Sequence, residues 1–263
     1  DAQAGSTVTM NGVISGAGGL TKGGSGTLVL NGANTYTGAT SVDAGLLRAG
    51  AANIFFSGAA MNAAAGAELN LNNFNQSVAA LSGSGAVTLG GARLTIGASG
   101  ASSVFGGSIS GTGNLVKAGT GVLPLTGANS YSGGTLVTQG VLLGTSTSLQ
   151  GNIVNNAMVV FDQAGTGSYA GIMSGSGSLV KNGAGTLVLS GVNTYSGGTI
   201  VTAGTLAGTT SSLRGPITNG ATVLLDQAID GTFAGTMSGT GTLVKSGTGT
   251  VTKNGDGTLI LGT

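Results

Sequence analysis

The sequence predicts an all-β protein, a right-handed parallel β-helix (β-solenoid) of about twelve coils. Three observations predict it. A 64-residue phrase repeats along the chain, apolar residues alternate with a period of two, and Gly, Asn and Ser interrupt these short runs every few residues. Short alternating strands alone would also fit a sandwich or a barrel. The repeat favours a solenoid, because sandwich strands have different neighbours and therefore need different sequences.

The alternation is clearest in "TLVLSG", where Leu187 and Leu189 point to one face of a strand and Val188 to the other. Thr, Val, Ile and Leu fill such runs, as is typical of strands. The stretch 51–68 is the one segment whose alanines favour a helix, but its Gly and Asn favour a loop. No other segment shows the periodicity of an amphipathic helix.

The repeats define the predicted organisation of a single β-helix domain over 1–263. A divergent region, 1–106, precedes two full repeats, 107–170 and 171–234, and a truncated copy, 235–263. We expect three coils per repeat, with equivalent residues stacked at about 4.8 Å per coil. On this expectation Leu28, Leu123, Leu187 and Leu259 occupy identical rungs. The right hand follows from the handedness of parallel crossovers.

Composition excludes several classes of protein. Only 15 of 263 residues are charged (8 basic, 7 acidic), so the chain lacks the basic clusters that nucleic acids require. At 40% hydrophobic residues and a net charge of +1, it should fold rather than stay disordered. There is no Cys for a disulfide or a thiolate metal site. Apolar runs are too short for a transmembrane helix. A surface with so little charge favours self-association.

No catalytic residue is predicted. Without His or Cys, the usual nucleophile–base pairs cannot form. Lysines recur in one slot, "L-x-K-x-G", and Lys253 resembles it, whereas a catalytic lysine would be singular. Because a buried ammonium is costly, we expect the chain to turn at each lysine and expose it to water. The slot contains Lys22, Lys117, Lys181 and Lys245.

The acidic residues do not form a predicted catalytic pair or a metal site. Asp162 and Asp226 are repeat equivalents, expected about 14 Å apart, which is too far for a glycosidase pair. Asp226 and Asp230 flank a turn, and Asp43 and Glu68 stand alone. The sequence "NGDG" at 254–257 has a single Asp, too few ligands for Ca²⁺. We therefore predict no metal and no cofactor, and the sequence identifies no binding residues.

Aromatic and Asn residues recur in register with the repeat. The rings are expected to fill corners of the core, with a carbohydrate-stacking platform as the alternative. The asparagines are expected to satisfy the backbone of turns. The positions are Tyr36, Tyr131 and Tyr195, each preceded by Asn34, Asn129 or Asn193, and a second slot with Phe105, Tyr169 and Phe233.

The phrase "GSGSLVKNGAGTLVLSGVNTYSGGTIVTAGTL" (175–206) resembles the passenger-associated transport repeat, or autotransporter-associated β-strand repeat, of bacterial autotransporters. It returns at 111–142 and 16–47, and 66–97 resembles the strands that link such repeats. The resemblance implies a passenger domain with a right-handed β-helix, at the cell surface or secreted across the outer membrane. It implies no fixed activity, since such passengers include adhesins, toxins and enzyme carriers.

These observations predict a non-enzymatic surface scaffold or adhesin that binds host or cell-surface ligands or itself. The chain begins and ends within repeats without a polar cap, so head-to-tail stacking into a fibre is one expectation, and lateral association another. Two alternatives stay open. One is a β-helix that binds or cleaves extracellular polysaccharide, and the other is a host-binding toxin module whose loop 51–68 carries recognition.

Overall fold

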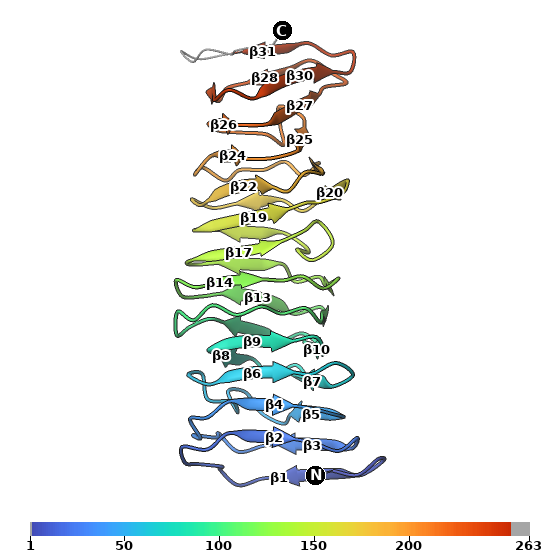
Figure 1. Cartoon of the computed structure of the whole chain (residues 1–263), viewed down its shortest axis with the longest axis vertical. Coiled ribbons are helices and arrows are strands. Elements are labelled where there is room, and N and C mark those ends of the chain that lie inside the picture. The colour runs from blue at the N-terminus through green and yellow to red at the C-terminus, as the bar shows by residue number, and fades with distance from the viewer. Residues whose placement is uncertain (1, 254–263) are drawn as a thin grey trace. The chain divides into compact units, whose positions relative to one another are not determined.

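The computed structural model describes residues 2–253, and in this range the chain forms short strands and turns and no helix. The chain divides into two compact units, Asp1–Leu142 and Leu143–Thr263. Within each unit the paired strands run parallel, so each is a β-solenoid as the repeat pattern predicts (Figure 1). The single domain over 1–263 and the right hand of the helix stay predictions.

The first unit is built mainly from three parallel sheets, to which successive coils contribute strands. The largest has seven strands, one for each of seven coils. Strands β2, β4, β6 and β9 of the second sheet are visible one above another in Figure 1. The sheets comprise β1 (Thr7–Met10), β3 (Thr27–Leu30), β5 (Leu46–Ala49), β7 (Glu68–Asn70), β10 (Ala86–Thr88), β12 (Ser108–Gly111) and β15 (Ser130–Tyr131); β2 (Leu20–Lys22), β4 (Thr40–Val42), β6 (Ala60–Ala63) and β9 (Ala80–Gly83); and β8 (Gln76–Val78), β11 (Arg93–Ile96), β13 (Asn114–Lys117) and β16 (Thr135–Val137), with β14 (Val122–Pro124) as a further strand.

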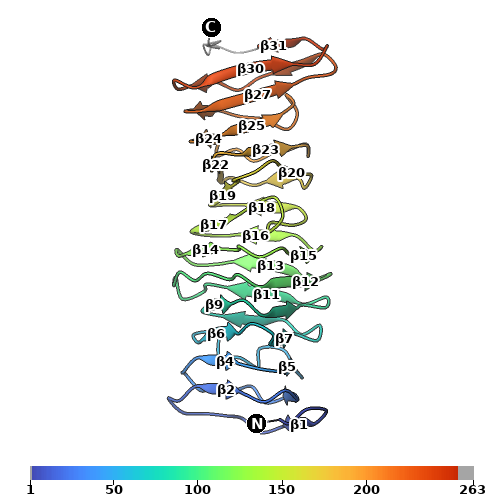
Figure 2. The ribbon, with the colours of Figure 1, turned by 45° about the vertical axis from the view of Figure 1, so that its right-hand side comes forward.

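The second unit repeats this design over five coils. Strands β27 and β30 lie one above the other in Figure 2, as their pairing requires. With the seven coils of the first unit, the described residues contain about the twelve coils predicted. The strands are β20 (Gly167–Tyr169), β23 (Thr186–Leu189), β25 (Thr205–Gly208), β27 (Thr222–Asp226) and β30 (Thr242–Ser246); β19 (Met158–Asp162), β22 (Ser178–Asn182), β24 (Thr199–Val201), β26 (Ile217–Asn219) and β29 (Met237–Ser238); β18 (Ile153–Asn155) and β21 (Met173–Ser174); β28 (Gly231–Phe233) and β31 (Val251–Lys253); and β17 (Val141–Gly144), which spans the boundary between the units.

The core of each unit consists of columns of aliphatic side chains, one residue per coil. No coil can bury its inner face alone, and the neighbours above and below close it. Each buried Leu or Val contributes about 1.5–3 kcal/mol to folding. One column of the first unit contains Leu28, Leu47, Leu69, Val87 and Ile109, and one of the second unit contains Leu187, Leu206, Val223 and Leu243.

The expectation of three coils per 64-residue repeat is wrong. In the second unit, strand register carries the chain from Gly167 to Val223 in three coils, a span of 56 residues. The repeat is therefore longer than three coils by about eight residues, less than half a coil. Its equivalents fall on different sheets, since Leu28 lies on β3, Leu123 on β14 and Leu187 on β23, so they do not occupy identical rungs. Leu259 lies outside the described residues. The columns stack similar residues of successive coils, not equivalent residues of successive repeats.

The segment 51–68 is a turn followed by strand β6 and the start of β7, so its alanines do not form a helix. Its apolar residues Ile54 and Phe55 are buried, and the Ile54 backbone accepts a hydrogen bond from Asn34 and donates one to Gln76. Tertiary burial of these side chains overrides the helix propensity of alanine. Residues 2–253 contain no helix that could span a bilayer.

Candidate functional site

Three lysines of the repeated slot lie inside the solenoid, contrary to the expectation that they face water. The exposed fractions are 2% for Lys22, 1% for Lys117 and 0% for Lys181. Strict alternation does hold along these strands, and it places each lysine on the same face as the apolar residue two positions before it. The turn expected at each lysine begins at the residue after it. Lys245, in the same slot, is exposed.

Each buried ammonium is held by three backbone carbonyls, which match its three donors. Two belong to the turn directly after the lysine, and the third belongs to the corner of the next coil. The Nζ atom donates to Gly23, Gly24 and Ala44 (2.8, 2.7 and 2.9 Å) in Lys22, to Ala118, Gly119 and Gln139 (2.7, 2.7 and 3.2 Å) in Lys117, and to Asn182, Gly183 and Ala203 (2.8, 2.8 and 3.0 Å) in Lys181. We call this arrangement the lysine corner.

The electrostatics of the lysine corner combine two opposing effects. Burial lowers the pKa of Lys181 below its ordinary value, and the carboxylate of Asp162 raises it. The three carbonyls favour the charged amine, because a neutral amine has one donor fewer and presents a lone pair to an oxygen. With all three N–H groups engaged, the corner joins two coils and offers no free amine for catalysis.

The tyrosine slot is part of the core, which confirms the first of the two predictions for it. Tyr36, Tyr131 and Tyr195 are no more than 2% exposed, so their rings cannot stack on a carbohydrate at the surface. Each hydroxyl bonds to a Thr hydroxyl four residues later. These partners are Thr40, Thr135 (2.9 Å) and Thr199 (2.6 Å). Burial raises the pKa of Tyr195 to about 12.

The asparagines of the same slot do bond to turn backbone, as expected, but the printed bonds run to the backbone of neighbouring coils. Asn193 accepts from the Met173 backbone (2.7 Å) in the preceding coil and donates to the Ser212 carbonyl (2.8 Å) in the following one. Asn34 bonds to Ile14 and Ile54 in the same way. Asn129 accepts from Ile109 (2.7 Å). The amide has a donor and an acceptor at opposite ends, which suits a position between two backbones.

The second aromatic slot is also buried. Phe105, Tyr169 and Phe233 are at most 4% exposed, and the Tyr169 hydroxyl donates to the Gly151 carbonyl at 2.5 Å. Tyr169 packs against Phe161 with ring centroids 5.1 Å apart. This contact joins two positions that are not repeat equivalents.

The acidic side chains do not converge. Asp162 and Asp226 are exposed, and they lie on β19 and β27 of different sheets. Asp226 accepts from Ser246 (2.7 Å), and Asp230 accepts from the Thr250 backbone (2.7 Å), which lowers the pKa of Asp230. Asp43 accepts from Ser41, and Glu68 from Asn70. No cluster of three metal-ligating acids occurs among residues 2–253, and 254–257 lies outside them.

The outer face of β23, β25, β27 and β30 carries two regular columns. We call it the threonine–valine face. Val188 and Leu224 are half-buried and Val244 is 40% exposed. A depression of about 270 Å³ lies over Val188, Ala207 and Leu224. The columns are Thr186, Thr205, Thr222 and Thr242, and Val188, Ala207, Leu224 and Val244.

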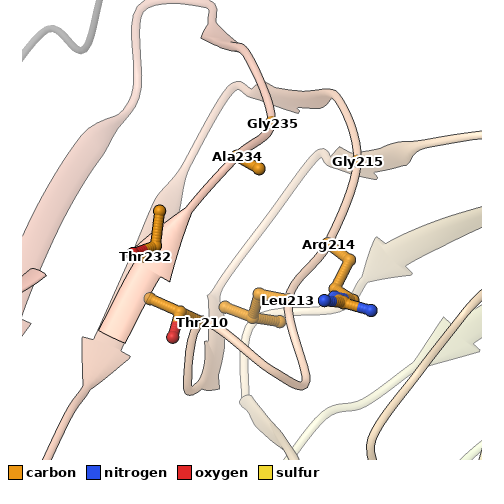
Figure 3. A pocket seen from close by; sticks show the side chains of 7 residues that line it. All are labelled: Thr210, Leu213, Arg214, Gly215, Thr232, Ala234 and Gly235. Atoms are coloured by element: carbon orange, nitrogen blue, oxygen red, sulfur yellow. The ribbon is translucent and has the colours of Figure 1, made fainter. Parts of the chain in front are cut away.

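A second hollow, about 200 Å³, lies between the loop 209–215 and the end of β28 (Figure 3). Figure 3 shows Arg214 on one side of Leu213 and Thr232 on the other. Composition gives no indication of this site, but within the repeat Arg214 stands where the preceding copy has Gln150. That departure from the repeat is the signal that could have found it.

Comparison with known proteins identifies the repeats and one similar protein. The passenger-associated-transport-repeat family matches residues 20–49, 115–143, 179–207 and 251–263. The chain is 49% identical over 146 residues to the adhesin BmaC autotransporter of Brucella suis biovar 1 (strain 1330). This match covers 53% of the chain and 4% of that adhesin. No solved structure matches. The chain therefore carries the passenger-associated-transport repeats of bacterial autotransporter passengers, which locates it at the bacterial cell surface or secreted across the outer membrane.

Proposed function

We propose that the chain is a non-enzymatic segment of a surface adhesin, in which the interior fixes the coils and the outer faces bind host or cell-surface ligands. The similarity to an adhesin over about half of the chain supports this role. The repeats support a passenger, but fold and repeat alone do not determine what a passenger binds.

The observation that carries the proposal is that the buried polar side chains form their hydrogen bonds inside the solenoid. The buried lysines and asparagines form hydrogen bonds with the backbone of neighbouring coils, and the buried tyrosines form them with core threonines. Strand register places Asp226 three coils beyond Asp162, about 14 Å along the stack, which is too far for both to act on one glycosidic bond. This arrangement supports a display scaffold over the alternative of a polysaccharide-cleaving β-helix.

Adhesion is tested by coating fluorescent beads with the purified chain and counting the beads retained by host cells and by extracellular-matrix proteins. The expected result is retention well above that of beads coated with the heat-unfolded chain. Equal retention of folded and unfolded chains contradicts the role. Incubation with soluble acidic and neutral polysaccharides, followed by a reducing-end assay, tests cleavage, and new reducing ends would contradict the non-enzymatic part.

The threonine–valine face favours a second role, lateral association of two copies. Val188, Leu224 and Val244 form an uncharged, partly exposed column around the buried Ala207, and like faces of low charge repel little. Sedimentation of the V188T/L224T variant should show weaker self-association than the parent. V192T, which changes a 55% exposed valine outside this face, is the matched control. Equal association of all three chains contradicts the proposal. Head-to-tail fibres remain a prediction for electron microscopy.

The alternative in which loop 51–68 recognises a host requires a different test from a deletion. Since Ile54 and Phe55 are core residues, removing the loop would damage the fold. Substitution of the exposed Asn53 and Ser57 leaves the core in place. Loss of cell binding in N53D/S57D with unchanged unfolding would favour this loop over a plain scaffold.

A further inference from the structure

Two equivalent loops of the second unit, 145–151 and 209–215, share one scaffold. In each, a Thr backbone N–H bonds to a Ser hydroxyl three residues later, and the Leu after that Ser bonds back to the Thr carbonyl. In each, a buried Gln from further along the chain accepts from the second loop residue: Gln163 from Ser146 (3.0 Å) and Gln227 from Thr210 (2.9 Å). Both loops are therefore held in a fixed conformation.

The loops differ at their tips. The side-chain amide of Gln150 donates a hydrogen bond to the Thr147 carbonyl of its own loop (2.8 Å). Arg214, its equivalent, is exposed, and within residues 2–253 its guanidinium has no hydrogen-bond or ion-pair partner. In the first loop Tyr169 also bonds to Gly151, whereas its equivalent Phe233 has no hydroxyl to offer Gly215. One scaffold thus carries a closed tip in one repeat and a free cation in the next.

The free cation lies at the edge of the 200 Å³ hollow described above. The fixed loop supplies Thr210, Leu213 and Gly215, and the chain around β28 supplies Thr232, Ala234 and Gly235 (Figure 3). The lining therefore combines a buried and an exposed threonine, Thr210 and Thr232, half-buried backbone at glycine, and one arginine. It has no aromatic ring and no large exposed apolar side chain that would hold the side chain of a peptide.

A guanidinium presents paired N–H donors that match a carboxylate, and threonine hydroxyls both donate to and accept from sugar hydroxyls. We propose that this hollow binds a carboxylate-bearing sugar residue, such as a uronic acid, of an acidic polysaccharide. The inference rests on the proposed adhesin role, for which it names a ligand class. The carboxylate pairs with Arg214, and the ring lies against Thr210 and Thr232.

The test is isothermal titration of the full chain with an oligosaccharide of uronic acid residues. The matched probe is the same oligosaccharide after reduction of its carboxyl groups to neutral alcohols. Arg214→Gln copies the tip of the equivalent loop and is expected to weaken binding of the acidic probe about tenfold or more, the loss typical of a charge-assisted pair. Arg93→Gln removes the same charge from an exposed position in the first unit and is expected to leave binding unchanged.

Several outcomes would overturn the inference: no heat with the acidic probe, equal affinity for the reduced probe, or an equal loss in R93Q and R214Q. If poly-glutamate binds as tightly as the uronate probe and with the same dependence on Arg214, the site recognises an acidic peptide and the sugar assignment is wrong. Retention of coated beads on cells tests the adhesin role separately, so beads that bind while the titration fails would reject this site and leave the adhesin role standing.

Discussion

At the scale of single residues, the lysine corner shows how a chain with few charges can bury some of them. Removing Lys181 as K181M keeps most of the apolar stem but leaves the carbonyls of Asn182, Gly183 and Ala203 without their donor. Relief of the buried charge offsets part of this loss. We expect a decrease of about 2 kcal/mol or more in the free energy of unfolding, measured by urea titration.

The control is K245M, since Lys245 is exposed and, among residues 2–253, its ammonium bonds only to the Gly247 carbonyl (2.6 Å). It should change stability by less than about 0.5 kcal/mol. If K181M unfolds at the same urea concentration as the parent, the three carbonyls do not depend on the ammonium and the corner is not a stabilising element.

The buried tyrosines predict how stability falls in alkali. The pKa of Tyr195 is raised from 10.0 to about 12 by burial, so the folded chain keeps this proton after the unfolded chain has lost it. Its contribution is fully present below pH 10 and is lost as the pH rises towards 12. By linkage the loss reaches about 2–3 kcal/mol.

Unfolding titrations of the parent and of Y195F between pH 9 and about 12 isolate this residue. Other groups titrate in the same window, but they are common to both chains. The stability of the parent relative to Y195F should therefore fall with pH. A constant difference would show that the phenol does not titrate differently in the folded and unfolded chains.

At the scale of elements, the corners limit which residues the solenoid accepts. Gly204 has a φ of 66°, and a Cβ built there would lie 2.3 Å from the Gly185 carbonyl of the preceding coil. We expect Gly204→Ala to cost about 2 kcal/mol or more, because it combines left-handed strain with a backbone clash. Gly165→Ala is the control, since a Cβ there meets nothing within 4 Å. Equal melting temperatures for the two variants would contradict this account.

Strands and their inward faces could be predicted from the sequence, because alternation and Gly-bounded runs are local signals. Coil length could not. Registers of 17 residues at Thr205 to Thr222 and 20 at Thr222 to Thr242 are set by how each corner packs, which the 64-residue period does not reveal. The buried lysines were missed for a related reason. A desolvation argument excludes them unless three carbonyls are known to converge, and only the "K-x-G" spacing indicates such a turn.

In the candidate site, too, features set by local sequence could be predicted, and features set by the packing of distant segments could not. That the tyrosines fill the core is predictable, since a ring in a strongly apolar repeat is usually packed. The bonds from Asn193 to two neighbouring coils are not, because they depend on the stacking order of segments about 20 residues apart. Arg214 could have been noticed as a departure from its repeat, but its hollow exists only once β28 lies beside the loop 209–215.

At the scale of the whole molecule, the scarcity of charge predicts how the chain holds a surface. Of its 15 charged residues, three lysines are buried, so little long-range electrostatic attraction is available. Contact must come mainly from hydroxyls, amides and half-exposed aliphatic residues, with the few exposed charged side chains, Arg214 among them, as minor contributors. Between about 0.1 M and 1 M NaCl, the Debye length falls from about 10 to 3 Å. Retention of coated beads on cells should fall less than about threefold over this range, since screening one ion pair leaves the uncharged contacts in place. Beads coated with a strongly basic protein, whose retention on cells falls as the salt concentration rises, serve as the salt-sensitive control. A steep loss for this chain would mean that adhesion depends on its few exposed charges, and the uncharged outer faces would then be a scaffold without a direct part in binding.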